Sequence, residues 1–199
     1  PTGLGLISMW VAIPLDIVSA LLVMKLAAFG PMKEGVAKQF KIFTNKHTWS
    51  MTALYIVTFG SFIGFSMALP LSMKVIFGVS HVPDANGVMQ HTLNNPNAPS
   101  VLAYAWIGPF VGAAVRPLGG WLSDKFGGAR VTAWSTLGMI AAAVLAGLQL
   151  TGVSGLEHPE ARFAGVFALF LALFTFAGIG NGSTFRMIPM IFEPKEAGP

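Results

Sequence analysis

The sequence predicts an all-α membrane protein with five transmembrane helices, and two observations carry this prediction. Hydrophobic residues make up 54% of the 199 residues and charged residues only 10%, with a mean hydropathy of +0.67, well outside the range of soluble globular domains. Several apolar stretches also reach about 20 residues, the length that an α-helix needs to cross a bilayer. The chain contains no cysteine, which excludes disulfides, thiolate catalysis and cysteine-ligated iron–sulfur clusters.

The apolar stretches give five predicted crossings. In chain order they are Leu6–Phe29, Trp49–Phe77, Ser100–Leu122, Val131–Leu150 and Phe163–Phe192. The second and fifth exceed the length of one crossing, so we expect them to tilt, kink or extend beyond the bilayer. Prolines inside the crossings predict bends, which neighbouring helices tolerate in a membrane. These prolines are Pro14, Pro70, Pro109, Pro117 and Pro189.

The charges of the connections predict the orientation of the chain. The connection between Gly30 and Thr48 is basic and looks amphipathic, with Lys33, Lys38, Lys41 and Lys46 against a single Glu34. Because cytoplasmic connections carry an excess of lysine and arginine, this stretch predicts the cytoplasmic side. The segment from Ser80 to Pro99 has no lysine or arginine and predicts the opposite side. The N-terminus is therefore expected outside and the C-terminus inside.

Lys74 and Arg162, at predicted outer ends of crossings, are the exceptions to this pattern. Most other basic residues lie where membrane topology places them, so the net charge of +4 gives no reason to expect a nucleic-acid partner. The chain begins without methionine, on the predicted outer side, and has an odd number of predicted crossings. We therefore expect it to be a fragment of a larger membrane protein.

Arg116 is the most informative single residue. It lies in the third predicted crossing, where no other residue between Ser100 and Leu122 is charged. A guanidinium keeps its proton, so inside a bilayer it needs a water-filled cavity, a partner or an anion. Gly108, Gly112 and Gly120 recur with it at intervals of four residues and predict a face that another backbone approaches closely. The alternative is an arginine whose charged end reaches the membrane interface.

The segment from Gly120 to Arg130, GWLSDKFGGAR, resembles the cytoplasmic loop motif of the major facilitator superfamily. In that motif a glycine is followed four residues later by an aspartate, then by a basic residue, a glycine and a further basic residue. We interpret Gly120 and Gly127 as positions of close backbone approach, and Asp124 as the partner of a cation or of a helix N-terminus. Lys125 and Arg130 would hold the turn in the cytoplasm. In the superfamily this motif is a conformational latch rather than a substrate site; the alternative is an ordinary charged turn.

Three further stretches resemble the nitrate/nitrite porter family of that superfamily. They are LYIVTFGSFIGFS at residues 54–66, WIGPFVG at residues 106–112 leading to Arg116, and GIGNGSTF at residues 178–185. The resemblance implies a non-enzymatic carrier of nitrate and/or nitrite in a bacterial inner (plasma) membrane, with these crossings as helices six to ten of twelve. Residues 1–48 would then hold the last helix of the N-terminal half and a basic linker. Residues 49–199 would hold four helices of the C-terminal six-helix bundle.

The resemblance also implies substrate-binding residues. In this family an arginine from each half of the transporter holds the planar anion, and Arg116 stands at the position of the one from the C-terminal half. Tyr55 and Phe59 stand where the family has a hydrogen-bonding tyrosine and a ring that packs against the anion. By helix rise alone, Tyr55 and Arg116 lie about 9 to 12 Å inside the predicted cytoplasmic ends of their crossings, so we expect them nearly level. The alternative for Tyr55 is a tyrosine of the interfacial belt.

The glycine-rich run in the fifth crossing places Asn181 about 16 Å inside Phe192 at the same helix rise, near the middle of the membrane. Gly180 and Gly182 beside it allow close helix packing. We expect this run to serve packing, with cavity lining or gating as the alternative. Arg186, closer to the cytoplasm, is interpreted as an interfacial arginine or a partner of the loop motif.

The sequence supports other classes of protein less well than a nitrate/nitrite carrier. A membrane redox subunit needs haem or quinone ligands, but the histidines lie in connections or at the ends of crossings, so we expect neither a cofactor nor a metal. A facilitator for another small anion or an organic solute would keep the loop motif, and a non-transporting scaffold would need Arg116 to be paired inside the protein. The absence of an embedded carboxylate from the last four crossings favours nitrate/nitrite exchange over proton symport. The coupling mode, the preferred anion, the role of Asp16 and the oligomeric state stay open.

Overall fold

The computed structural model of the chain describes residues 3–27, 41–83, 85–153 and 155–192. The chain divides into two compact units, residues 1–49 with 198–199 and residues 50–197, and each is described by itself. Four spans are long and apolar enough to cross a membrane: Lys46–Phe77, Val101–Phe126, Gly128–Val153 and Pro159–Ile191. They correspond to the second to fifth predicted crossings, so the membrane-spanning part is helical as predicted. Lys33, Glu34 and Lys38 of the basic connection lie outside the described residues.

The first unit contains the helix α1 (Gly3–Ala27) and the short 3-10 helix η1 (Lys41–Thr44). α1 has 25 residues with Pro14 inside, but its apolar segment Ile13–Val23 is shorter than the four spans. The first crossing therefore stays a prediction. Asp16 is exposed, and its backbone carbonyl accepts a hydrogen bond from Ser19 Oγ (2.9 Å); no ion pair among the described residues involves its side chain.

The second predicted crossing is a continuous rod with two widened turns. It runs through α3 (Lys46–Tyr55), the π-helix η2 (Ile56–Gly60), α4 (Ser61–Ser72) and the π-helix η3 (Met73–Phe77). In η2 the fully buried Thr58 donates a hydrogen bond from Oγ1 to the carbonyl of Leu54 (2.9 Å), so its hydroxyl is satisfied within the helix. Single π-helical turns are frequent at functional sites, and η2 lies near the middle of this crossing.

The third predicted crossing is broken into three helices, α5 (Val101–Tyr104), α6 (Ile107–Ala114) and α7 (Arg116–Phe126). Pro117 lies in the first turn of α7, where a missing N–H is tolerated because that group has no helical partner. The break separates Arg116 from the regular hydrogen bonding of α6. The predicted bend at this proline is thus a helix boundary.

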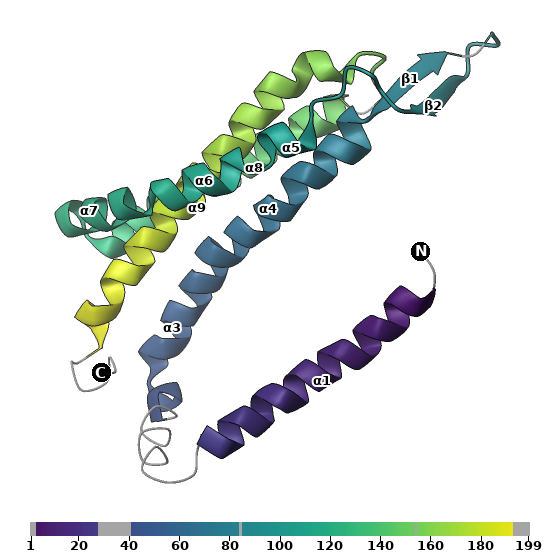
Figure 1. The fold of residues 1–199 in the computed structure, drawn as a ribbon. Coiled ribbons are helices and arrows are strands. Elements are labelled where there is room, and N and C mark those ends of the chain that lie inside the picture. The colour runs from purple at the N-terminus through teal and green to yellow at the C-terminus, as the bar shows by residue number, and fades with distance from the viewer. Residues whose placement is uncertain (1–2, 28–40, 84, 154, 193–199) are drawn as a thin grey trace. The chain divides into compact units, whose positions relative to one another are not determined.

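The connection after η3 contains a β-hairpin that the sequence analysis did not predict. β1 (Val79–Pro83) pairs antiparallel with β2 (Met89–Leu93), with His81 opposite His91, and the hairpin extends from the end of the helical rod (Figure 1). Gly87 in its turn has a φ of 76°, which favours glycine. The Asn86–Gly87 pair between two runs of alternating residues is the sequence signal that could have predicted it.

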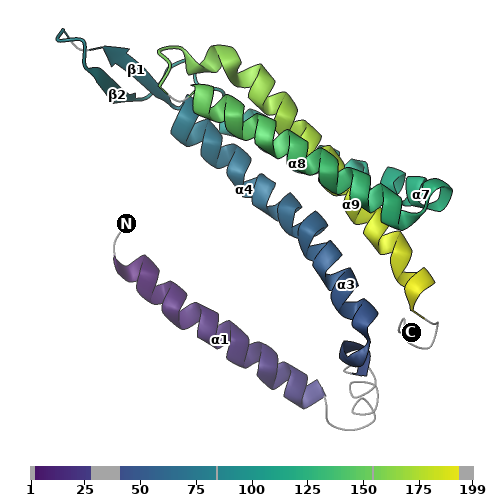
Figure 2. The ribbon, with the colours of Figure 1, turned by 180° about the vertical axis from the view of Figure 1, so that it is seen from behind.

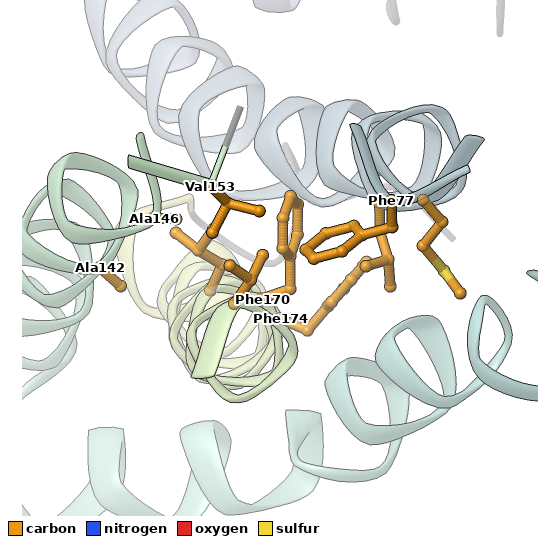
Figure 3. Close-up of a cluster of buried hydrophobic side chains, with 10 residues drawn as sticks. Phe77, Ala142, Ala146, Val153, Phe170 and Phe174 are labelled. Atoms are coloured by element: carbon orange, nitrogen blue, oxygen red, sulfur yellow. The ribbon is translucent and has the colours of Figure 1, made fainter. Parts of the chain in front are cut away.

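The last two spans are α8 (Gly128–Val153) and α9 (Phe163–Ile191), with the 3-10 helix η4 (Pro159–Arg162) before α9. α9 is the central helix of the second unit: it packs along α4, α6, α7 and α8, as the two opposite views show (Figures 1 and 2). Its side chains Phe170 and Phe174 lie between Phe77 of η3 and the small residues of α8 in the main hydrophobic cluster (Figure 3). The full cluster consists of Leu69, Met73, Phe77, Ala142, Ala146, Val153, Val166, Phe170, Leu173 and Phe174.

Toward the C-terminal end of α9, beyond the hydrophobic cluster, backbone contacts between α9 and the broken third crossing replace side-chain packing. A Cβ at Gly178 would overlap the carbonyl oxygen of Gly112, and a Cβ at Gly182 would overlap that of Arg116. In the other direction, a Cβ at Gly119 would overlap the carbonyl oxygen of Ile179. Small residues of this kind let membrane helices approach until backbone meets backbone.

We expect Gly178→Ala to destabilise the protein by about 1 to 3 kcal/mol, the usual cost of overpacking a close contact. The matched control is Gly147→Ala in α8, because a Cβ there meets nothing within 4 Å. Thermal unfolding of both variants of the full-length protein in detergent measures the difference. Equal melting temperatures for the two variants would show that the α6–α9 contact is looser than described.

Candidate anion-binding site

Arg116 begins α7 and its side chain crosses to the second span. Its guanidinium carbon lies 5.4 Å from the ring centroid of Phe59 and 5.0 Å from that of Phe62. Both distances are within the range of cation–π attraction. The guanidinium is therefore held against two aromatic side chains of the second span.

The aromatic residues that meet Arg116 belong to one face of the second span. Tyr55, Phe59 and Phe62 are spaced by four and three residues, so they share a helix face. The Tyr55 ring stacks on Phe59 with centroids 5.1 Å apart, and Phe59 stacks on Phe62 at 6.1 Å. Tyr55 thus joins the cluster through Phe59, and none of the hydrogen bonds among the described residues involves its hydroxyl. Phe62, seven residues after Tyr55, is a contact of Arg116 that the sequence analysis missed although its spacing indicated it.

α9 completes this cluster from the other side. Phe185 meets the Tyr55 ring edge-on at 5.5 Å, and Phe174 meets the Phe62 ring in the same way at 5.5 Å. The edge-to-face geometry is favourable because the positive edge of one ring faces the negative face of the other. Tyr55, Phe59, Phe62, Phe174 and Phe185 form what we call the aromatic wall of the site.

Two residues of the described membrane helices have buried polar side-chain atoms without a hydrogen-bond partner. They are Arg116, at Nε, and Asn181, at both Oδ1 and Nδ2. Buried polar groups in proteins are nearly always paired, so unpaired ones need a specific explanation. Arg116 is also absent from the ion pairs of the described residues, which are Asp124–Arg186 and His158–Glu160. Its charge is thus uncompensated within the part of the chain that the structure describes.

A hollow of about 390 Å³ connects Arg116 with the end of α9. Pro117 and Gly120 of α7 and Gly182, Phe185, Arg186 and Pro189 of α9 line it together with Arg116. Arg116 gives the hollow a positive charge that has no ion-pair partner among the described residues, whereas Arg186 is paired with Asp124. Small anions are attracted to such a surface.

The loop motif forms an ion pair with α9. Asp124 Oδ1 accepts a hydrogen bond from Arg186 Nε at 2.6 Å, so of the two interpretations of Arg186 the structure shows a partner of the motif. Lys125 lies over the Trp121 ring, with Nζ 4.2 Å from the centroid. Arg130 is exposed. The motif therefore ties α7 to α9 through one exposed ion pair.

The close backbone approach expected at Gly120 and Gly127 is wrong. A Cβ at Gly120 would lie 4.0 Å from its nearest neighbour, and one at Gly127 would meet nothing within 4 Å. An α-helix makes close to two full turns in seven residues, so Gly119, seven residues after Gly112, lies on the face of Gly112 and makes the tight contact instead of Gly120. Gly127 is needed for its φ of 86° at the end of α7. The tight contact of the loop is at Gly128, where a Cβ would lie 2.6 Å from Sδ of Met187.

The glycine-rich run of α9 packs against three neighbours. Gly180 faces Thr58 and Ser135, whose atoms would lie 3.0 and 3.2 Å from an added Cβ. Ser183 Oγ donates to the carbonyl of Gly128 (3.0 Å) and accepts from Thr132 Oγ1 (3.1 Å). These contacts show the packing that the sequence predicted for the run. Asn181, fully buried and unpaired, is the exception in it.

Comparison with known proteins gives the family. No protein-family model matches the chain. It is 38% identical over 186 residues to a probable nitrate/nitrite antiporter NarK2 of Thermus thermophilus, covering 94% of this chain and 38% of that protein. It is also 38% identical over 185 residues to the nitrate/nitrite transporter NarU of Salmonella typhimurium, and 35% identical over 190 residues to NarU of Escherichia coli, covering 92% of this chain and 35% of each relative. The chain is therefore a homologue of the nitrate/nitrite transporters, which confirms the resemblance, and it spans little more than a third of their length.

We expect Asp124→Asn and Arg186→Gln each to reduce the transport rate of the full-length protein while changing equilibrium anion affinity by less than about two-fold. The pair is exposed, and Asp124 lies eight residues, or about 12 Å, beyond Arg116 on α7. Arg186 lines the hollow beside Arg116, but its charge is already paired, so loss of the pair should alter helix movement more than binding. Transport and binding measured on the same preparations test this. Part of the rate should return in the exchanged pair Asp124→Arg with Arg186→Asp. A collapse of affinity at an unchanged rate would remove the motif from conformational control.

Proposed function

We propose that this homologue of the nitrate/nitrite transporters is part of a carrier that moves nitrate and/or nitrite across a bacterial membrane by alternating access. The observation that carries the proposal is the guanidinium of Arg116 beside the aromatic wall, whose buried Nε has no hydrogen-bond partner and whose charge has no ion-pair partner among the described residues. The names of the relatives, which are nitrate/nitrite transporters rather than enzymes, supply the substrate class.

In this proposal the crossings correspond to helices six to ten of a twelve-helix major facilitator fold. Residues 1–48 hold the last helix of the N-terminal half and the basic linker, and residues 49–199 hold four helices of the C-terminal bundle. The share of the relatives' length that the chain spans, 35–38%, is compatible with five helices of twelve. Rocking of the two halves around a central site would then expose the anion to either side.

Arg116 would bind the anion through paired N–H groups. A guanidinium offers two parallel donors to two oxygens of a planar anion, which a lysine ammonium cannot match. A second arginine, from outside this chain, would complete the clamp. The charge of Arg116 supports this role because a cation inside the membrane without a protein carboxylate is stabilised by an anion.

The aromatic wall would orient the guanidinium and exclude water. Phe59 and Phe62 hold Arg116 by their faces, which leaves its N–H edges free for a ligand. Exclusion of water strengthens each hydrogen bond to the anion because the local dielectric constant is low. Tyr55, stacked on Phe59, would add a hydroxyl donor at the edge of the wall.

The alternative functions predict different responses to nitrate. A facilitator for another solute would bind that solute in place of nitrate, and a scaffold would bind neither. The lack of a partner for Arg116 among the described residues argues against the scaffold. Thermal stabilisation of the full-length protein by nitrate, but not by a neutral solute, distinguishes these functions, and counterflow measurements distinguish nitrate/nitrite exchange from proton symport.

We expect Arg116→Lys to abolish or strongly reduce nitrate uptake while the protein still reaches the membrane. Lysine keeps the charge but lacks the planar pair of donors. The matched control is Arg162→Lys at the exposed start of α9, which should transport normally. Normal uptake by Arg116→Lys at low nitrate concentration would exclude Arg116 from the binding site.

We expect Tyr55→Phe to weaken nitrate binding by about ten-fold to over a hundred-fold, because a hydrogen bond to a charged acceptor contributes about 1.5 to 3 kcal/mol. The substitution keeps the stacking on Phe59 and removes only the hydroxyl. Tyr104→Phe is the control, since Tyr104 packs against Phe163 and Phe167 in another part of the helix bundle. An affinity change of less than about two-fold in Tyr55→Phe would exclude the hydroxyl from the site.

A further inference from the structure

We propose that Asn181 is a second polar ligand of the Arg116 site, with its Oδ1 accepting a hydrogen bond from the guanidinium and its Nδ2 donating one to the anion. This inference rests on the proposed function, since it names a further residue of the same site. Sequence alone predicted a packing role for this residue.

Helix geometry places Asn181 at the same level along the helix bundle as Arg116, which we call the layer of Arg116. Gly180 abuts Thr58 of the second span and Gly182 abuts the carbonyl of Arg116. Successive residues of an α-helix are rotated by about 100°, so the side chain of Asn181 points into the angle between these two neighbours. That angle is the space between the second span and α7.

The rings before and after Asn181 on α9 give the same placement independently. Phe174 and Phe185, seven residues before and four residues after it, share its helix face. Phe174 contacts Phe62 and Phe185 contacts Tyr55. The residue between them on this face therefore lies opposite the stretch between Tyr55 and Phe62, where Phe59 and Phe62 hold Arg116.

The burial of Asn181 is costly unless something pairs with its amide. Its exposed fraction is 0% and both amide atoms lack a partner, which leaves a desolvated donor and a desolvated acceptor. Three neighbouring buried hydroxyls are paired: Thr58 with Leu54, Thr184 with Gly180, and Ser183 with Gly128. Packing alone would be served by an apolar residue, so the unpaired amide indicates a ligand.

The unpaired atoms of the two residues complement a small oxyanion. Nitrate and nitrite accept hydrogen bonds but donate none, so Nδ2 of Asn181 can bind them whereas Oδ1 cannot. Oδ1 needs a donor, and Arg116 Nε is an unpaired buried donor in the same layer. Pairing these two atoms would satisfy both, fix the guanidinium on the aromatic wall, and direct Nδ2 toward the anion. The phenylalanines of the wall offer no donor that could replace it.

The experiment compares two buried residues of α9 in the full-length transporter. Asn181→Ala removes the unpaired amide, and the matched control Ser183→Ala removes a buried hydroxyl whose two partners are in the protein. Nitrate affinity and melting temperature without nitrate are measured for each. We expect Asn181→Ala to lose about ten-fold in nitrate affinity with little change in melting temperature, and Ser183→Ala to lower the melting temperature while keeping its affinity.

A second variant, Asn181→Asp, tests the charge at nearly constant shape. A carboxylate would pair with Arg116 in place of the anion, so we expect nitrate binding to fall further than in Asn181→Ala. Nitrate affinities of both Asn181 variants within about two-fold of wild type, or failure of both variants to fold, would overturn the proposal and assign Asn181 to the structure. If wild type itself does not bind nitrate, it is instead the proposed function that fails.

Discussion

The contact between the glycines of α9 and the carbonyl oxygens of α6 and α7 positions everything around Arg116. Because Gly178 and Gly182 lack side chains, α9 lies directly against the backbone at Gly112 and Arg116, at a distance that leaves no room for a side chain between them. Only at this distance do Phe174 and Phe185 of α9 reach the rings of Phe62 and Tyr55. The same contact lies beside the helix break at Pro117, which places the guanidinium at the start of α7.

The energetics of this arrangement favour a ligand. Attraction between a guanidinium and an aromatic face contributes about 0.5 to 2 kcal/mol, whereas withdrawing an ion from water costs several kcal/mol even after the protein relaxes. Arg116 is half-buried, with its Nε fully buried, so part of this cost applies to it, and Phe59 and Phe62 orient the guanidinium without supplying an opposite charge. The deficit is smaller when an anion supplies opposite charge at the same place, and in the proposed carrier this difference is the source of affinity.

Sequence alone predicted the helical membrane class, four of the crossings and the family, because hydropathy over about 20 residues and the quoted motifs are local signals. It also singled out Arg116, since a single charge within an apolar run is visible in the sequence alone. The spacing of four residues pointed to Gly120, whereas the helix period of about 3.6 residues places Gly119 on the face of Gly112, so this contact could have been predicted. Sequence alone could not predict the tight contact of Gly128 with Met187, because that contact depends on how α8 packs against α9. Nor could it choose a partner for Arg186: the 2.6 Å pair with Asp124 joins residues 62 positions apart. Whether the amide of Asn181 has a hydrogen-bond partner likewise depends on which side chains of the neighbouring helices surround it, and this is a tertiary property.

α7 and α9 each carry one residue of the proposed anion site and one of the loop ion pair. On α7 these are Arg116 and Asp124, eight residues or about 12 Å apart along the axis; on α9 they are Asn181 and Arg186. The helices touch at the level of Arg116: a Cβ at Gly182 would overlap the carbonyl oxygen of Arg116, and one at Gly119 that of Ile179, so backbone meets backbone there and no side chain interlocks. Asp124 lies about two turns farther along α7. A change of tilt between α7 and α9 about this contact would therefore move Asp124 and Arg186 apart more than it moves Arg116 and Asn181. In the proposed carrier, the loop ion pair could then open and close while the two proposed ligands of the anion stay together.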